Sequence, residues 1–161
     1  MSIFKDIMEA LTDANINMIG VCGHEKSRHT ETILEKVSTR AKRDNLFDVI
    51  ETVTLKGKTN LGRIQQEIAD VLGCSIQEEK AACCLPYFLN QKIVAERARQ
   101  LSEWIKKKEK VLLIISALDT RLDLAQIGIP FGEDHKGCKV MVVSKSDETL
   151  SQMKTQKIFF L

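Results

Sequence analysis

Two short apolar runs in the last third of the chain constrain the fold more than any other feature. Val111–Ile115 is continuously apolar, and Lys139–Val143 is a second run in which apolar residues follow a single lysine. Such short runs, each followed by a polar segment, are typical of strands buried inside a sheet. The polar segments begin at Ser116 and Ser144, so hydroxyl groups stand where the two predicted strands end.

Helices and further strands alternate along the rest of the chain. Helical spacing of apolar residues predicts helices at about Ile3–Leu11, Thr30–Lys42, Leu61–Leu72 and Ile93–Ile105, and short apolar runs predict strands at Met18–Cys22, Asp48–Leu55 and Lys157–Leu161. Asn60 is a suitable N-cap, and Gly73 a suitable stop, for the third of these helices. Alternating strands and helices imply an α/β domain with a parallel sheet and right-handed crossovers.

Composition excludes several classes of protein. The 161 residues suit one domain, and 43% hydrophobic with 29% charged residues argues against disorder. With 24 Lys and Arg against 22 Asp and Glu, the net charge of +2 gives no reason to expect a nucleic-acid partner.

Cysteine and histidine spacing argues against disulfides and metal sites. The five cysteines include no CxxC pair, and the three histidines lie in polar sequence without a paired ligand motif. The sequence begins without a secretory signal and contains no run of about 18 apolar residues that could span a membrane. We therefore expect a cytoplasmic protein with reduced thiols and no metal ligands.

The polar loop after the first predicted strand is the candidate binding site. A strand, a polar loop and a helix form the place where P-loop proteins hold phosphates, with glycine amides, a lysine and a hydroxyl. The candidate nucleotide-binding residues come from this loop and helix and from the ends of the two later strands: Gly23, Lys26, Ser27, Arg28, His29, Thr30, Thr32, Ser116 and Lys145.

A second register of the phosphate motif is also open. Gly20–Ser27 differs from G-x-x-x-x-G-K-[ST] by one residue, because Glu25 stands at the last glycine. We favour coincidence, since Gly20 belongs to the predicted strand and a glutamate would place negative charge beside phosphate.

The strings Ile127–Gly132 and His135–Cys138, together with Glu96–Leu101, resemble the NB-ARC nucleotide-binding domain of plant coiled-coil NBS-LRR disease resistance proteins. The resemblance spans nearly the whole chain. It implies a three-layer P-loop NTPase-like fold with a parallel five-stranded sheet, and residues 1–161 forming a single domain without the ARC subdomains and leucine-rich repeats. It also implies ADP or ATP with magnesium as ligand and a role in plant defense.

The chain departs from this family at the residues that bind phosphate and metal. The family's Walker A lysine falls on His29 or Thr30 and its hydroxyl pair on Glu31–Thr32, and the two Walker B aspartates align with Ser116 and Ala117. Lys145 stands where the family usually has an arginine that senses the terminal phosphate. Charge-assisted hydrogen bonds contribute about 1.5–3 kcal/mol each, so losing two weakens binding by roughly two to four decades.

These departures lead to two functional hypotheses. The first is an NB-ARC-like domain whose ADP or ATP binding is weakened or lost and which is not an enzyme, since Asp119 lies three residues beyond the first expected aspartate. The second is a nucleotide-independent interaction module or decoy for other immune-receptor proteins, with Pro86–Leu89 in an inserted segment near 81–94 as a contact patch. Packing of that patch under a loop, and a degenerate duplicate without activity, are further alternatives.

Overall fold

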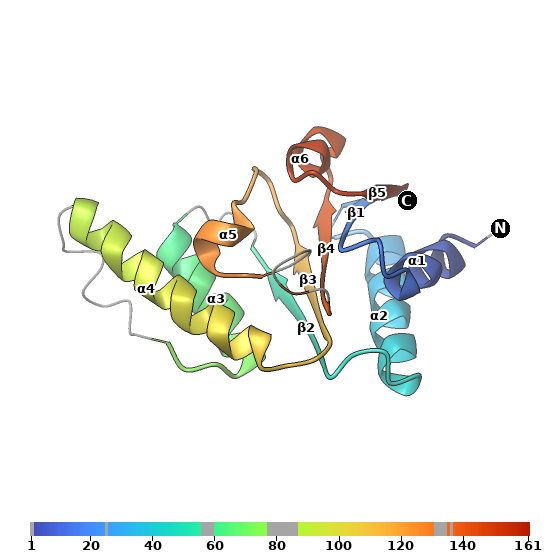
Figure 1. The fold of residues 1–161 in the computed structure, drawn as a ribbon. Coiled ribbons are helices and arrows are strands. Elements are labelled where there is room, and N and C mark those ends of the chain that lie inside the picture. Colours follow the sequence, from blue (N-terminus) through green and yellow to red (C-terminus); the bar gives the residue numbers. More distant parts are fainter. Residues whose placement is uncertain (1, 25, 56–59, 77–86, 131–134, 136) are drawn as a thin grey trace.

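Helices and strands alternate along most of the chain in the computed structural model, which describes residues 2–24, 26–55, 60–76, 87–130, 135 and 137–161 (Figure 1). The strands are β1 Met18–Cys22, β2 Val49–Thr54, β3 Val111–Ser116, β4 Cys138–Ser144 and β5 Lys157–Phe160. The helices are α1 Ile3–Thr12, α2 Arg28–Arg43, α3 Leu61–Leu72, α4 Tyr87–Lys106, α5 Leu124–Ile127 and α6 Asp147–Gln152.

The five strands form one parallel sheet in the order β2-β3-β4-β1-β5. The predicted parallel five-stranded sheet is therefore confirmed, and β2, the strand after Asp48, lies at one side as expected. Because the strands are parallel, the ends of β3, β4 and β1 lie next to one another at a single edge of the sheet.

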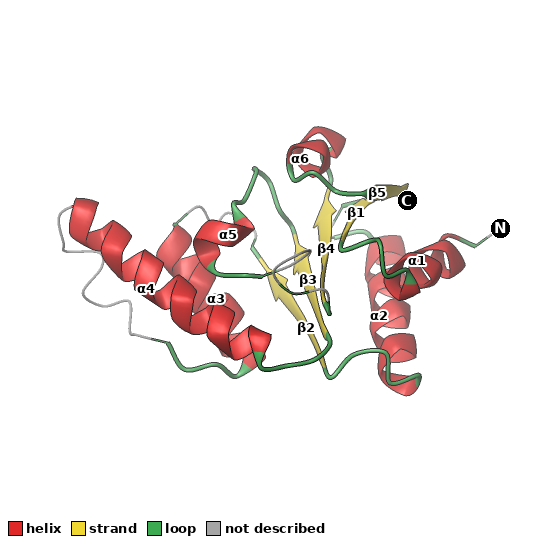
Figure 2. Ribbon diagram, in the orientation of Figure 1, coloured by secondary structure: helices red, strands yellow, loops and turns green. Residues whose placement is uncertain are grey.

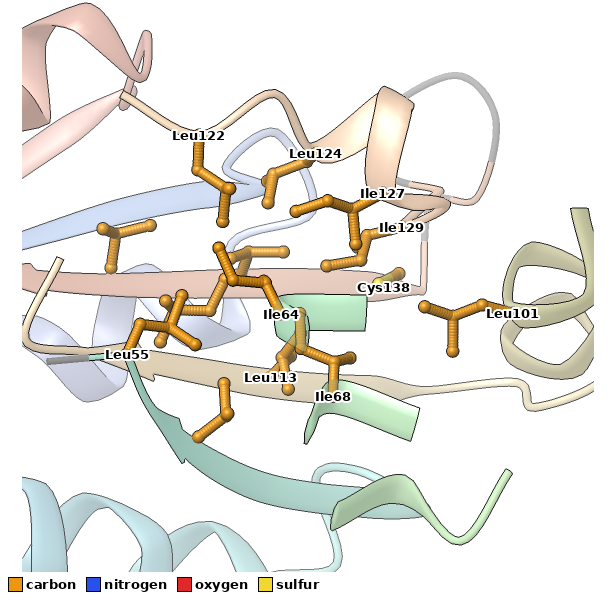
Figure 3. Packing of buried hydrophobic residues seen from close by; sticks show 14 of the residues in the cluster. Leu55, Ile64, Ile68, Leu101, Leu113, Leu122, Leu124, Ile127, Ile129 and Cys138 are labelled. Atoms are coloured by element: carbon orange, nitrogen blue, oxygen red, sulfur yellow. The ribbon is translucent and has the colours of Figure 1, made fainter. Parts of the chain in front are cut away.

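Two helical layers cover the sheet. Figure 2 shows α1 and α2 on one side of the strands and α3, α4 and α5 on the other. Figure 3 shows the larger apolar cluster, in which Ile64 and Ile68 of α3 pack beside Leu113 of β3. On the opposite face, Ile7 and Val37 belong to a second cluster.

The central strands are buried along their whole length because helices cover both faces. This burial extends to Lys139 of β4, whose Nζ donates a hydrogen bond of 2.6 Å to the carbonyl of Asp13, just after α1. Burial lowers the pKa of Lys139, and nearby Asp13 partly offsets that effect. The lysine therefore joins the end of α1 to the sheet.

Side-chain and backbone caps fix both ends of α3, as predicted. The Asn60 side chain accepts a hydrogen bond from the N–H of Arg63 at 3.1 Å, and Gly73 ends the helix at φ +78°. In the middle of α3, the fully buried Gln65 donates from Nε2 to the carbonyls of Val94 at 2.9 Å and Ile127 at 3.0 Å. These bonds hold α3 against α4 and α5.

Several predicted boundaries are wrong. Helix α2 begins at Arg28, two residues before the expected start, and α4 begins at Tyr87 rather than near Ile93. Residues 87–89 are therefore helical, while Pro86 and the start of the proposed insertion lie outside the described residues. Helices α5 and α6 were not predicted, because four and six residues are too few to show a helical period.

Candidate functional site

The candidate site lies at the edge of the sheet where β1, β3 and β4 end. Ligands of open parallel sheets bind outside the carboxyl ends of the strands, where loops from neighbouring strands converge. The loop of residues 23–27 connects β1 to α2 at this edge. The structure thus places the predicted phosphate loop next to the end of β4 and Lys145, and at the same edge of the sheet as Ser116, which ends β3 on the far side of β4.

Three backbone N–H groups of the loop already donate to acceptors of the protein. The N–H of Gly23 donates to the carbonyl of Ser144 at 2.9 Å, and that of Ser27 to the carbonyl of His24 at 2.9 Å. The N–H of Lys26 donates to the imidazole Nδ1 of His24 at 3.1 Å. His24 therefore supplies two of the three acceptors, one from its backbone and one from its side chain.

Within the part of the chain that the structure describes, the first amides of α2 pair with no acceptor of the protein. Ser27 is the N-cap residue and makes no side-chain capping hydrogen bond, and the first helical bond runs from the N–H of Glu31 to the carbonyl of Ser27 at 3.0 Å. The amides of the first turn, at Arg28, His29 and Thr30, therefore precede the first helical bond. They lie at the positive end of the dipole of a 16-residue helix.

The candidate cations are exposed side chains of the loop, of the first turn of α2 and of the residue after β4. Lys26, Arg28 and His29 are exposed, and so is Lys145 after β4. Solvent screens all four, so each attracts a phosphate less than a buried, positioned cation would.

The two candidate threonines lie in different surroundings. Thr30 is buried, with 1% of its surface exposed, whereas Thr32 is exposed. A Cβ built on Gly23 would lie 2.7 Å from the Thr30 hydroxyl oxygen, so only a glycine lets the loop pack so closely on this side chain. The structure therefore brings Gly23 and Thr30 together and leaves Thr32 exposed on α2.

The end of β3 carries no acidic side chain. Ser116 is its last residue and is buried, Ala117 follows with φ +60°, and the exposed Asp119 lies beyond Leu118. Among the described residues, no group of three or more His, Cys, Asp or Glu could hold a metal ion. Magnesium prefers carboxylate oxygens, so the hydroxyl and methyl groups at this strand end do not fit a magnesium site.

Sequence reasoning missed two residues that organise the site. The buried Ser144 hydroxyl donates to the carbonyl of Leu118 at 2.6 Å and accepts from the N–H of Ser146 at 3.1 Å, so it joins the loops after β3 and β4. The sequence feature that could have indicated Ser144 is its position directly after the predicted strand Lys139–Val143. His24 was missed because no sequence pattern indicates a side chain that binds the backbone of its own loop.

The thiol beside the site is not activated. Cys22, the last residue of β1, donates from Sγ to the carbonyl of Lys145 at 3.8 Å. Burial, followed by the negative charge of Asp147, raises the pKa of Cys22 above its ordinary value of 9.0. The thiol is therefore protonated at neutral pH and is a poor nucleophile.

The fold resembles that of a solved nucleotide-binding protein. It matches the structure of the ORC2 protein of Aeropyrum pernix in ADPNP–ADP complexes with a TM-score of 0.52 and 17% identity, over 98% of this chain and 44% of that chain. The parallel sheet and this likeness establish an α/β P-loop NTPase-like fold.

Sequence comparison finds relatives among plant disease resistance proteins. The chain is 26% identical to Disease resistance protein At4g27190 of Arabidopsis thaliana over 157 residues. This aligned stretch covers 96% of this chain and 15% of that protein. It is 23% identical over 123 residues to Disease resistance protein RPS5 of Arabidopsis thaliana, covering 76% of this chain and 13% of that protein. The chain therefore spans about 15% of the first of these relatives and 13% of the second.

None of the described helices is both long and apolar enough to cross a membrane.

The NB-ARC domain model matches residues 2–160, almost the full sequence. On that match, the chain belongs to the NB-ARC domain family.

Proposed function

We propose that this NB-ARC domain binds ADP or ATP weakly through its phosphates, without magnesium and without hydrolysis, and serves a plant disease resistance protein. Family membership supports a nucleotide ligand, and the relatives support the biological setting. The observation that carries the weak, non-catalytic part is the end of β3, where Ser116 and Ala117 stand in place of acidic residues.

The remaining phosphate-binding groups support a weak site. An anion at the first turn of α2 meets the amides of Arg28, His29 and Thr30 and the exposed side chains of Lys26 and Arg28. Exposed ion pairs contribute only about 0–1 kcal/mol each. Binding in the millimolar range corresponds to about 4 kcal/mol, which amides and screened cations can supply together.

Catalysis lacks its main contributors. Phosphoryl transfer depends on positioned cations and a metal that neutralise developing charge. The carboxylate nearest in sequence to the end of β3 belongs to Asp119, which is exposed. Among the described residues, Asp119 takes part in one hydrogen bond, in which its backbone carbonyl accepts from Thr149 Oγ1 at 3.3 Å. We therefore expect phosphate release from ATP at the background rate, with no change in Asp119→Ala; a turnover that this substitution abolishes would contradict the proposal.

Thermal unfolding with ADP and ATP, each with and without magnesium, tests binding. At a ligand concentration five times the Kd, the native state gains about 1 kcal/mol, which raises the Tm by roughly 2–4 °C. We expect this shift only at millimolar nucleotide, and of equal size with and without magnesium. The double variant Lys26→Gln/Arg28→Gln should lose it, while Lys36→Gln, which alters an exposed lysine farther along α2, should keep it. No shift, or a shift that requires magnesium, would refute the proposal.

A further inference from the structure

We infer that the His24 imidazole accepts a hydrogen bond from a backbone N–H group of the phosphate loop, that of Lys26, and so competes with an anionic ligand for this group. This inference rests on the proposed function, because it concerns how the same site admits phosphate. On this inference, His24 sets the affinity of the site by weakening ligand binding, and its side chain makes no attractive contact with the ligand.

The geometry of the imidazole carries this inference. His24 Nδ1 accepts a hydrogen bond from the N–H of Lys26 at 3.1 Å, which requires a free lone pair on that nitrogen. The His24 carbonyl accepts from the N–H of Ser27 at 2.9 Å. In a phosphate loop, successive N–H groups point toward the oxygens of the ligand. A ligand oxygen can therefore take the Lys26 amide only after the imidazole leaves it.

Two contacts hold Gly23, at the start of the loop, independently of the imidazole. Gly23 is fixed by its bond to the carbonyl of Ser144 and by close packing against the buried Thr30. His24 is exposed, and its side chain belongs to neither apolar cluster. Rotation of the imidazole toward solvent would break its bond to the Lys26 amide without unpacking either apolar cluster. The amide then joins those of the first turn of α2 in facing an anion.

The competition has a measurable size. An intramolecular hydrogen bond contributes about 0.5–1.5 kcal/mol net, so displacement of the bond between His24 Nδ1 and the Lys26 amide by itself weakens ligand binding roughly two- to tenfold. Removing the imidazole acceptor should strengthen anion binding by that factor. A substitution that keeps an acceptor in the same place should leave it weak.

A matched pair of variants separates the acceptor from the rest of the side chain. His24→Ala removes the acceptor, whereas His24→Asn keeps it, because asparagine Oδ1 occupies the position of Nδ1 and accepts from the amide two residues later. Both variants remove the imidazole ring. Their difference therefore reports the acceptor, independently of any effect of the ring itself.

Two measurements on the wild type and both variants test the inference. Amide hydrogen exchange without ligand should become faster at Lys26 in His24→Ala and remain slow in His24→Asn. Isothermal titration with inorganic pyrophosphate, without magnesium, should give a Kd about two- to tenfold lower for His24→Ala than for the other two proteins.

The possible results distinguish the inference from the function on which it rests. If all three proteins bind pyrophosphate equally, the binding function stands and the role of His24 is refuted. If His24→Ala leaves Lys26 exchange unchanged or binds more weakly than His24→Asn, the inference is refuted as well. If none of the three binds at millimolar pyrophosphate, both the inference and the proposed binding function are refuted.

Discussion

Replacing Gly128 by alanine should destabilise the protein strongly, because the absence of a side chain at Gly128 allows α5 to lie close against α4. Gly128 ends α5 at φ +109°, and its N–H donates to the carbonyl of Leu124 at 3.0 Å. A Cβ at this position would lie 2.6 Å from Cα and 2.8 Å from the carbonyl carbon of Ala98, and would also meet the Ala98 oxygen. Since the obstacle is helix backbone, no side-chain rotation relieves it.

The cost has two parts that a control variant separates. A side chain at this φ costs about 1–3 kcal/mol in backbone strain, and the forced movement of α5 away from α4 costs about 1–3 kcal/mol more. Gly73 also has a positive φ, of +78°, but a Cβ there meets nothing within 4 Å. Gly73→Ala should therefore show only the first part of the cost.

Urea unfolding followed by circular dichroism measures both variants. We expect Gly128→Ala to lose about 1–3 kcal/mol more than Gly73→Ala, which corresponds to a further decrease in Tm of roughly 2–12 °C for a domain of this size. Equal losses in the two variants would show that the approach of α5 to the α4 backbone does not limit this position. That result would refute the reasoning.

Two further predictions concern buried groups. Ser144→Ala should lower the free energy of unfolding by about 1–3 kcal/mol in urea titrations, because the Leu118 carbonyl and Ser146 N–H lose their shared partner; an unchanged midpoint would contradict this. Burial raises the pKa of Cys138 from 9.0 to about 12, so the folded thiol keeps its proton where the unfolded one loses it. The free energy of unfolding should therefore fall as pH rises from 9 to 12, by at most about 1.4 kcal/mol per unit from this group, and Cys138→Ala should show a shallower fall than the wild type. Identical slopes would exclude this thiol as a cause.

The strands and long helices could be predicted from sequence because burial imposes a pattern on them. Strand β3 is predictable because a strand covered on both faces is nearly continuously apolar. The prediction Val111–Ile115 is one residue shorter than the observed strand, which ends at Ser116. Asn60 and Gly73 were predicted because caps depend on the chemistry of single residues. Helix α5 could not be predicted, because its four residues are ordered by packing and by the cap at Asp123.

The candidate site was less predictable than the fold. The sequence placed the candidate loop between β1 and α2, but it could not show that Thr30 packs beneath Gly23 while Thr32 faces solvent. That difference follows from the start of α2 at Arg28, and helix boundaries are the least certain part of a sequence prediction. The contact of His24 with Lys26 depends on the conformation of the loop itself, which no periodicity encodes.

The strand order determines when this domain can fold during its synthesis. Strand β1 pairs only with β4 and β5, so that Met18 lies opposite Val140 and Ile19 opposite Lys157. At about 5–20 residues per second, a ribosome needs roughly 6–24 s after making β1 to deliver β4. Throughout that interval the apolar β1 lacks its neighbours on both sides. Folding must therefore close a very long loop late, which makes it slow and leaves apolar strand surface exposed on the nascent chain in the meantime.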